Sequence, residues 1–280
     1  MPPIEQQPVF RVKEAVRAVL MLPRKLTSGS RLLPHWLIIG TQKGGTTSLY
    51  AELCQHPLVA GAFRKEPHFF DEHWHRGVDW YRANFARVAP GRVAGEASPY
   101  YLFDPVVPPR VQQVLPQAKL IVMLRNPVDR AWSHYHHERR RGHETLTFEE
   151  AIEAEPARLA TNDPYAINHY SYLARGRYAE QLERWLKFFP RERLHIIRSE
   201  DYYADPAAVY AQTLRFLGLP AFEEVKRQKL NAGTYRDRMD EAMRQRLQAY
   251  FEPYNQALYK LIGRDMQWET TARDSASNST

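Results

Sequence analysis

Cysteine is nearly absent from this 280-residue sequence, in which Cys54 is the only example. One cysteine excludes an internal disulfide and a cysteine-based zinc site, and it favours a protein of the reducing cytoplasm. Long hydrophobic runs are absent too, since no stretch approaches the roughly 18–20 apolar residues of a membrane-spanning helix. The first ten residues include three prolines and a glutamate, unlike a secretory signal peptide. We therefore expect a cytoplasmic localisation.

The composition is that of a globular chain with a basic surface. Hydrophobic residues make up 44% of the sequence and charged residues 25%, which excludes a disordered or collagen-like protein. The net charge is +7, from 39 basic and 32 acidic residues, and it favours anionic partners. Net charge does not by itself distinguish a nucleotide from a polysaccharide, a nucleic acid or a lipid.

Residues 1–31 are predicted to form a basic amphipathic arm. Six lysines and arginines against two glutamates give this segment +4 of the net charge. Apolar residues recur in it at helical spacing, which predicts a short helix before Pro23. Two interpretations remain open. The arm is either packed or frayed against the main domain, or residues 9–25 contact an anionic membrane, which would place the protein peripherally at the inner membrane surface.

Short apolar runs alternate with helical patterns between residues 32 and 269. Strands are predicted at residues 36–40, 92–96, 119–124 and 193–198. Helices are predicted at residues 47–55, 106–115, 129–141, 148–155, 178–189, 206–217 and 241–262. Because the strands are apolar throughout and separated by helices, we predict an α/β fold, a three-layer α/β/α domain with a central parallel sheet. The small, polar residues 270–280 predict a disordered tail.

A glycine-rich loop follows the first predicted strand and opens the first predicted helix. Residues 40–48 read Gly-Thr-Gln-Lys-Gly-Gly-Thr-Thr-Ser. Glycines let backbone N–H groups turn around an anion, and the helix N-terminus adds partial positive charge. The frame is that of a Walker P-loop, but Thr46 takes the place of its lysine, and Lys43 lies three positions earlier. With no Walker B aspartate either, we expect a phosphate site without magnesium-assisted γ-phosphoryl transfer.

Three further stretches follow this loop. Residues 65–70 read Lys-Glu-Pro-His-Phe-Phe and precede Gly-Val-Asp-Trp-Tyr at 77–81. Residues 124–135 read Leu-Arg-Asn-Pro-Val-Asp-Arg-Ala-Trp-Ser-His-Tyr, and residues 181–190 read Gln-Leu-Glu-Arg-Trp-Leu-Lys-Phe-Phe-Pro. In this order, the four stretches resemble the motifs of sulfotransferases that use 3′-phosphoadenosine 5′-phosphosulfate (PAPS), most closely the heparan sulfate 3-O- and N-sulfotransferase branch. The resemblance implies the P-loop-like sulfotransferase fold over residues 32–269.

The resemblance also implies an activity and a set of site residues. The enzyme would move a sulfuryl group from PAPS to a hydroxyl or amine and release 3′,5′-ADP, with no metal. Lys43 would stabilise the leaving phosphate, Glu66 would be the base, and His68 would orient Glu66 or bind the acceptor. The nucleotide would be bound by Lys43, Gly44, Gly45, Thr46, Thr47, Ser48, Arg125, Ser133, Tyr178, Gly233 and Arg236, with Arg125 and Ser133 at the 3′-phosphate.

The chemistry of the acceptor side gives two further expectations. A hydroxyl has a pKa far above neutral, so its attack is helped by a positioned base. The neighbouring pair Phe69 and Phe70 is expected to keep the site dry and raise the pKa of Glu66. His68 is expected on the same side of an extended chain as Glu66.

Two positions depart from the animal glycan enzymes of this branch. Ala97 and Ala232 stand where those enzymes carry lysines, so PAPS use is little affected but a glycosaminoglycan acceptor is put in question. We expect an acceptor that is a small molecule, lipid or glycan, and no nucleic acid partner. The alternatives are a P-loop kinase or NTPase, disfavoured by Thr46, and a non-catalytic nucleotide-binding module, which has no need of Glu66.

A cluster of histidines begins at the end of the stretch 124–135, within the helix predicted at 129–141. His134, His137 and Glu138 share a face of this helix. Three interpretations are open for the cluster: a metal site, a basic rim for an anionic acceptor, and a solvated helix face.

Overall fold

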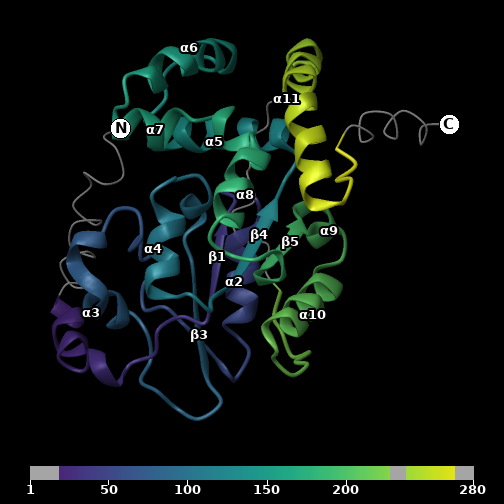
Figure 1. The fold of residues 1–280 in the computed structure, drawn as a ribbon. Coiled ribbons are helices and arrows are strands. Elements are labelled where there is room, and N and C mark those ends of the chain that lie inside the picture. Colours follow the sequence, from purple (N-terminus) through teal and green to yellow (C-terminus); the bar gives the residue numbers. More distant parts are fainter. Residues whose placement is uncertain (1–18, 228–237, 269–280) are drawn as a thin grey trace.

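The structure is a computed structural model that describes residues 19–227 and 238–268 (Figure 1). Residues 1–18, the predicted site residues Gly233 and Arg236, and the predicted tail at 270–280 lie outside the described residues. In the described part of the chain, no helix is both long and apolar enough to cross a membrane.

A five-stranded parallel sheet forms the centre of the molecule, in the order β2-β3-β1-β4-β5. The strands are β1 Trp36–Gly40, β2 Val59–Gly61, β3 Val93–Ala97, β4 Lys119–Leu124 and β5 Leu194–Arg198. Four of them agree with the sequence prediction to within one residue, whereas β2 is too short to give a pattern. The strand order reverses between β1 and β4, and in open α/β sheets ligands bind beside the carboxyl ends of the strands at such a point.

Helices cover both faces of the sheet, as the three-layer prediction requires. One face packs on α3 (Gly77–Arg82), α4 (Val107–Val114), α8 (Tyr178–Leu186) and the end of α11 (Glu241–Ile262). The other packs on α2 (Thr46–Leu53), α9 (Ser199–Ala204) and α10 (Pro206–Leu217). The side chains of each strand alternate between the two layers: Leu37 belongs to the first and Ile38 to the second, and both are fully buried.

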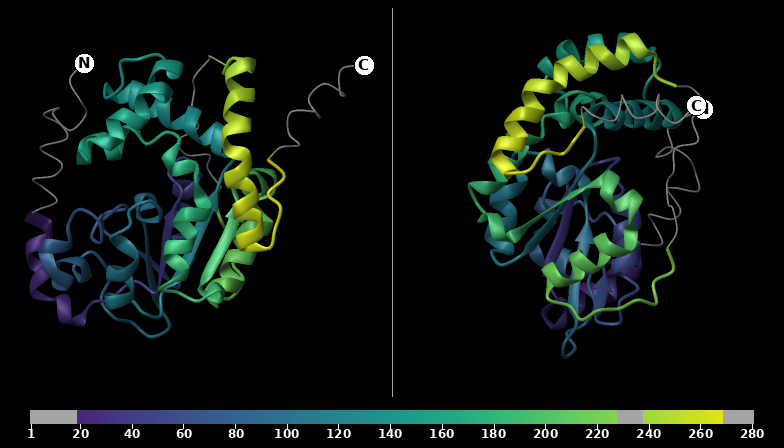
Figure 2. Two further views of the ribbon diagram at one scale, coloured as in Figure 1. Left: turned by 45° about the horizontal axis from the view of Figure 1, so that its top comes forward. Right: turned by 90° about the vertical axis from the view of Figure 1, so that its right-hand side faces the viewer.

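A further group of helices lies beyond the carboxyl ends of the strands (Figure 2). It consists of α5 (Pro127–Arg141), α6 (Phe148–Ala160), α7 (Pro164–Tyr170) and the first half of α11. Helices α5, α6 and α11 share an apolar cluster that includes Tyr135, Phe148 and Phe251. Helix α6 continues through Pro156, although its end was predicted at residue 155, because the fixed φ of proline is itself helical. Short 3-10 turns lie at Ser28–Ser30, Trp74–Arg76, Pro99–Leu102, Ala174–Gly176 and Arg191–Arg193.

The described part of the predicted arm is attached to the main domain. Residues 19–26 are helical, so the prediction of a helix that ends before Pro23 is wrong. Met21 is buried in the core, and Arg24 donates hydrogen bonds to the carbonyls of Ala83 at 2.7 Å and Phe85 at 2.9 Å. The remaining large apolar side chains of this helix are exposed to solvent: Val19, Leu20, Leu22 and Leu26.

Candidate active site

The glycine-rich loop turns tightly from the end of β1 into α2. The Thr41 N–H donates to the carbonyl of Met123 on β4 at 2.8 Å, and the Gly44 N–H donates to the carbonyl of Thr41 at 3.0 Å. A Cβ on Gly44 would lie 2.8 Å from the Met123 carbonyl oxygen, so no larger residue fits. Gly45 has φ +96° and forms the N-cap of α2. The loop therefore presents the first turn of α2, with Thr46, Thr47 and Ser48, at the switch point of the sheet.

Lys43 projects from this loop among other charged side chains. Its φ of +72° is unusual for a residue with a side chain and is typical of functional loops. Burial, together with the nearby guanidinium groups of Arg140 and Arg125, lowers the pKa of the Lys43 ammonium to about 8, while the Glu138 carboxylate opposes the change. An ammonium with so much unbalanced positive charge around it is suited to an anionic ligand.

The sequence stretch that follows β4 lies directly beside the loop. The Arg125 guanidinium donates to the carbonyl of Lys43 at 3.2 Å, and the Tyr178 hydroxyl donates to the carbonyl of Arg125 at 2.9 Å. Ser133 is buried on α5, about two turns from the start of that helix. Asp129, also on α5, pairs with Arg244 at 2.9 Å. The structure thus brings Lys43, Arg125 and Tyr178 together from three separate elements.

The predicted base lies on the irregular segment between β2 and α3. The Glu66 side chain is 39% exposed; one of its oxygens pairs with the Lys65 ammonium, and the other lies 3.5 Å from His68 Nε2. On the other side of the ring, His68 Nδ1 lies 2.7 Å from Asp71. These carboxylates raise the pKa of His68 well above its usual value, although burial opposes them, so an imidazolium sits between two carboxylates.

Two of the three expectations for this segment are wrong. Burial alone would raise the pKa of Glu66, but the hydrogen bond from His68 and the charge of Lys65 outweigh it and lower the pKa to about 2. Phe69 and Phe70 do not wall the carboxylate, because both rings are fully buried in the core, where Phe69 stacks on Tyr81 at 4.4 Å. The expectation that His68 lies on the same side as Glu66 is confirmed, since its Nε2 lies 3.5 Å from the Glu66 carboxylate, although the backbone at His68 is not extended but has φ +50°.

A family model described as the sulfotransferase domain matches residues 33–231, which is most of the sequence. The chain belongs to the sulfotransferase family.

Individual relatives agree with this assignment. Heparan sulfate glucosamine 3-O-sulfotransferase 6 of Mus musculus is 32% identical over 272 residues, which cover 89% of this sulfotransferase and 77% of the relative. The membrane-associated sulfotransferase kil1 of Dictyostelium discoideum is 29% identical, and the match covers 85% of this chain and 67% of the relative. The crystal structure of a sulfotransferase from Alicyclobacillus acidocaldarius is similar with a TM-score of 0.74 at 35% identity, covering 85% of this chain and 99% of that one. The predicted fold and enzyme class are confirmed.

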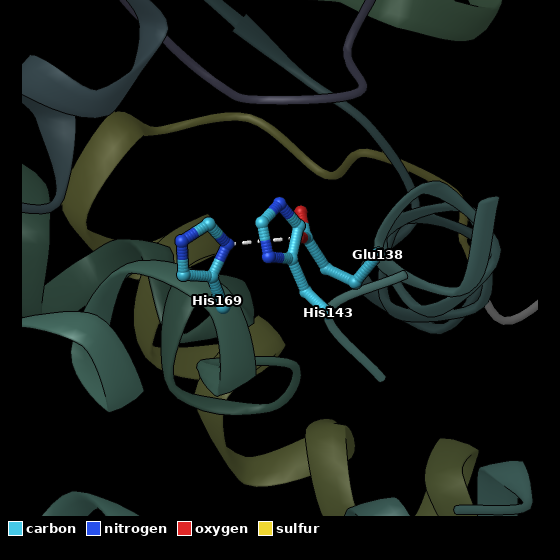
Figure 3. Close-up of side chains that lie close together, drawn as sticks. All are labelled: Glu138, His143 and His169. Carbon is cyan, nitrogen blue, oxygen red and sulfur yellow. Dashed lines mark hydrogen bonds and ion pairs between the residues drawn. The ribbon is translucent and has the colours of Figure 1, made fainter. Parts of the chain in front are cut away.

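The histidine cluster on α5 is largely buried in this sulfotransferase. Glu138 accepts a hydrogen bond from His169 Nδ1 on α7 at 2.8 Å (Figure 3). Its other oxygen lies 3.5 Å from His134 Nε2. Burial would raise the pKa of Glu138, but these imidazoles lower it well below its usual range. The interpretation of His134 and Glu138 as a solvated helix face is therefore wrong. The ring of His169 also stacks on that of His143 at 4.1 Å.

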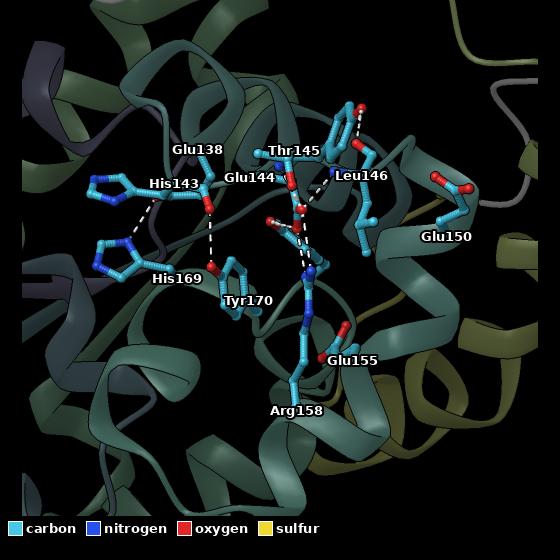
Figure 4. A network of polar contacts seen from close by, with 12 residues as sticks. Glu138, His143, Glu144, Thr145, Leu146, Glu150, Glu155, Arg158, His169 and Tyr170 are labelled. Atoms are coloured by element: carbon cyan, nitrogen blue, oxygen red, sulfur yellow. Dashed lines mark hydrogen bonds and ion pairs between the residues drawn. The ribbon is translucent and has the colours of Figure 1, made fainter. Parts of the chain in front are cut away.

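Beyond this cluster a second buried carboxylate fixes the loop between α5 and α6 (Figure 4). Glu144 accepts two hydrogen bonds from Arg158, at 2.6 and 3.2 Å, and one from the Tyr172 hydroxyl at 2.9 Å. Glu144 and His169 were not predicted as site residues from the sequence. The sequence of α7, which carries His169, has too little apolar periodicity to predict this helix, although Asp163 before Pro164 is a recognisable start signal for a helix.

Proposed function

We propose that this sulfotransferase uses PAPS as its sulfuryl donor and a hydroxyl or amine as its acceptor. One observation carries the proposal: the Arg125 guanidinium binds the backbone of Lys43 at the switch point of the sheet, close enough for its charge to lower the pKa of the Lys43 ammonium. Such a site suits a nucleotide with phosphates at two positions, one at the loop and one at the end of β4.

On the donor side, the amides around Gly44 and Gly45 and the first turn of α2 hold the 5′-phosphate. Lys43 neutralises the charge that develops on the bridging oxygen as the bond between sulfur and that oxygen breaks. Arg125 and Ser133 hold the 3′-phosphate, and the Tyr178 hydroxyl fixes the backbone of Arg125. The products on this side are 3′,5′-ADP and a sulfuryl group passed on in line to the acceptor.

On the acceptor side, a bond forms between the acceptor oxygen or nitrogen and sulfur while its proton passes to the Glu66 carboxylate. Glu66 is ionised and can accept a proton, but the pairs with Lys65 and His68 make it a weak base. An anionic acceptor would compete with Glu66 for the Lys65 ammonium, and loss of that pair would raise the pKa of Glu66 toward a more useful value.

For the acceptor itself, we propose a glycan, ahead of a lipid or another small molecule. The heparan sulfate glucosamine 3-O-sulfotransferases among the relatives support this choice by their names. Ala97, which is fully buried at the end of β3, supplies no cationic contact at the position where the animal glycan enzymes carry a lysine. We therefore expect a glycan with fewer negative charges than heparan sulfate.

Two measurements test the proposed function. Thermal shift should show stabilisation of the full chain by 3′,5′-ADP and none by ATP or GTP with Mg²⁺; the reverse pattern would indicate a P-loop kinase or NTPase. Transfer of label from ³⁵S-labelled PAPS should then be compared for heparan sulfate, its N-acetylated unsulfated precursor and p-nitrophenol. Label on p-nitrophenol alone would refute the glycan acceptor and leave the donor intact.

We also propose that the protein is cytoplasmic and contacts the inner membrane surface through the helix that includes residues 19–26. The exposed side chains of Leu22 and Leu26, with Lys25 between them, support a shallow contact with anionic lipid. The full chain should pellet with phosphatidylserine vesicles at low salt and not with phosphatidylcholine vesicles. Replacing Leu22 and Leu26 by Ser should abolish the pelleting at unchanged thermal stability; equal pelleting of both proteins would contradict the contact.

A further inference from the structure

A phenol in the core is hydrogen-bonded to the segment that carries Glu66 and His68. Tyr101 lies on the 3-10 turn after β3, and its hydroxyl accepts a hydrogen bond from the N–H of Phe69 at 2.9 Å and a longer one from the N–H of Phe70 at 3.4 Å. Phe69 directly follows His68 in the chain. Tyr101 is fully buried, so water does not compete for these N–H groups.

The same hydroxyl donates its single proton to a buried carboxyl group. Tyr101 Oη lies 3.2 Å from Glu96 Oε1 at the end of β3, and Glu96 also accepts hydrogen bonds from Tyr81 and Ser98, each at 2.6 Å. A phenol with its proton committed to a carboxyl oxygen is a better acceptor for an N–H group. A series of hydrogen bonds therefore connects the loop to the sheet: the Phe69 N–H donates to the Tyr101 hydroxyl, and that hydroxyl donates to Glu96.

Other contacts also hold the loop: the Arg110 guanidinium on α4 donates to the carbonyl of Phe70 at 2.7 Å, and the rings of Phe69 and Phe70 are buried in the core. Between the end of β2 and the turn at Trp74–Arg76, the backbone forms no regular element. The Glu72 and His73 N–H groups both donate to the carbonyl of His68, which closes the turn on itself without tying it to the sheet. The hydroxyl of Tyr101 supplies that tie at the residue next to His68.

We propose that Tyr101 is a positioning residue for sulfuryl transfer. Its hydroxyl links Glu96, which is fixed on β3, to the backbone next to the Glu66–His68 segment and so holds that segment in place. This inference rests on the proposed role of Glu66 as the base. A displacement of about 1 Å in a reacting group costs a factor on the order of 10² in rate. Loss of one of several restraints is expected to cost less than that.

Tyr101→Phe removes the hydroxyl and keeps the ring, so it should lower kcat about 10- to 50-fold. The affinity for 3′,5′-ADP should stay within about twofold, because the nucleotide site is built on β1 and β4. Tyr81→Phe is the matched control, since it removes a hydroxyl from the same Glu96 oxygen but has no bond to the loop backbone. Its kcat should stay within about threefold of wild type at a similar loss of thermal stability.

Release of 3′,5′-ADP from PAPS is the readout, measured with the acceptor found above and with water alone, together with thermal unfolding of each full-length variant. In the double variant Glu66→Gln with Tyr101→Phe, the rate should be no lower than in Glu66→Gln alone, because Tyr101 acts through the group already removed. A rate that falls equally in Tyr101→Phe and Tyr81→Phe, or an additive loss in the double variant, would overturn the positioning role. A nearly normal rate in Glu66→Gln alone would instead refute the role of Glu66.

Discussion

Removal of the Arg125 guanidinium is expected to erase the preference of this sulfotransferase for nucleotides with a 3′-phosphate. Arg125 directly follows the buried strand β4, and its backbone is fixed by the hydroxyl of Tyr178. A guanidinium presents five N–H donors in a planar fork, which matches a phosphate in a bidentate way. The Arg125 guanidinium donates a hydrogen bond to the carbonyl of Lys43, and that contact engages only one side of the fork.

The expected size of the effect follows from these contacts. Hydrogen bonds to charged groups contribute about 1.5–3 kcal/mol each. Two such bonds from Arg125 therefore correspond to about 3–6 kcal/mol, or a loss of 3′,5′-ADP affinity on the order of 10²- to 10⁴-fold. The affinity for 5′-AMP, which lacks the 3′-phosphate, should change little. Ser133→Ala removes one neutral donor and should cost only about 0.5–1.5 kcal/mol.

Calorimetric titration of 3′,5′-ADP and of 5′-AMP into wild type and Arg125→Ala measures this directly. Arg244→Ala is the control, since it breaks the pair with Asp129 on α5 without touching the expected phosphate site. Equal affinities of wild type for the two nucleotides would refute the 3′-phosphate site. An equal loss for both nucleotides in Arg125→Ala would show that Arg125 acts on the loop through the Lys43 carbonyl and not on the phosphate.

Three further changes have defined outcomes. Lys43→Ala should lower the rate of 3′,5′-ADP release by about 10²–10³-fold at unchanged thermal stability, and a normal rate would remove Lys43 from the mechanism. Wild-type kcat/KM should fall above pH 8, where Lys43 with its pKa of about 8 loses its proton, and this fall should disappear in the variant. Glu66→Gln should stop turnover while calorimetry shows 3′,5′-ADP affinity within about twofold, and a parallel loss of both would make Glu66 a nucleotide-binding residue. Burial raises the pKa of Glu96 to about 7 in the folded protein, so the native state keeps a proton that the unfolded chain loses near pH 4.5. The free energy of unfolding therefore falls by about 3 kcal/mol as pH rises from 4.5 to 7. Urea unfolding at pH 5 and pH 8 should show a smaller loss in Glu96→Gln, and an unchanged loss would contradict the raised pKa of Glu96.

Most of the fold could be predicted because its strands are buried on both faces and its helices are long. β4 and α10 have the bounds that the sequence predicted, since an unbroken apolar run and a proline start are strong local signals. β2, α3 and α9 were not predicted, as each has six residues or fewer. Their existence depends on the neighbours that cover them, which a local pattern does not contain.

The candidate site was predictable where chain order alone places the residues. A loop between a strand and a helix puts Lys43 at the sheet edge, and a strand end puts Arg125 beside it. The pair of Glu66 with His68 was expected from the sequence, but the Tyr81 partner of Glu96 and the His169 partner of Glu138 were not predictable, because they come from other elements of the fold. His169 reaches Glu138 from 31 positions away, and its helix carries no clear periodic signal.

The partners of these carboxyl groups decide the direction in which burial shifts them. Glu66 and Glu138 are held by imidazoles, and their pKa values fall although burial alone would raise them. Glu96 and Glu155 accept hydrogen bonds from neutral hydroxyl and backbone N–H groups, and both have a pKa raised to about 7. Desolvation thus dominates where no cationic side chain is hydrogen-bonded to the carboxyl group, even though more distant positive charges lower its pKa in part. The expectation that a dry environment raises the pKa of a glutamate in this protein was therefore sound, but it applies to Glu96 and not to Glu66. Glu66, beside Lys65 and His68, remains an ionised acceptor.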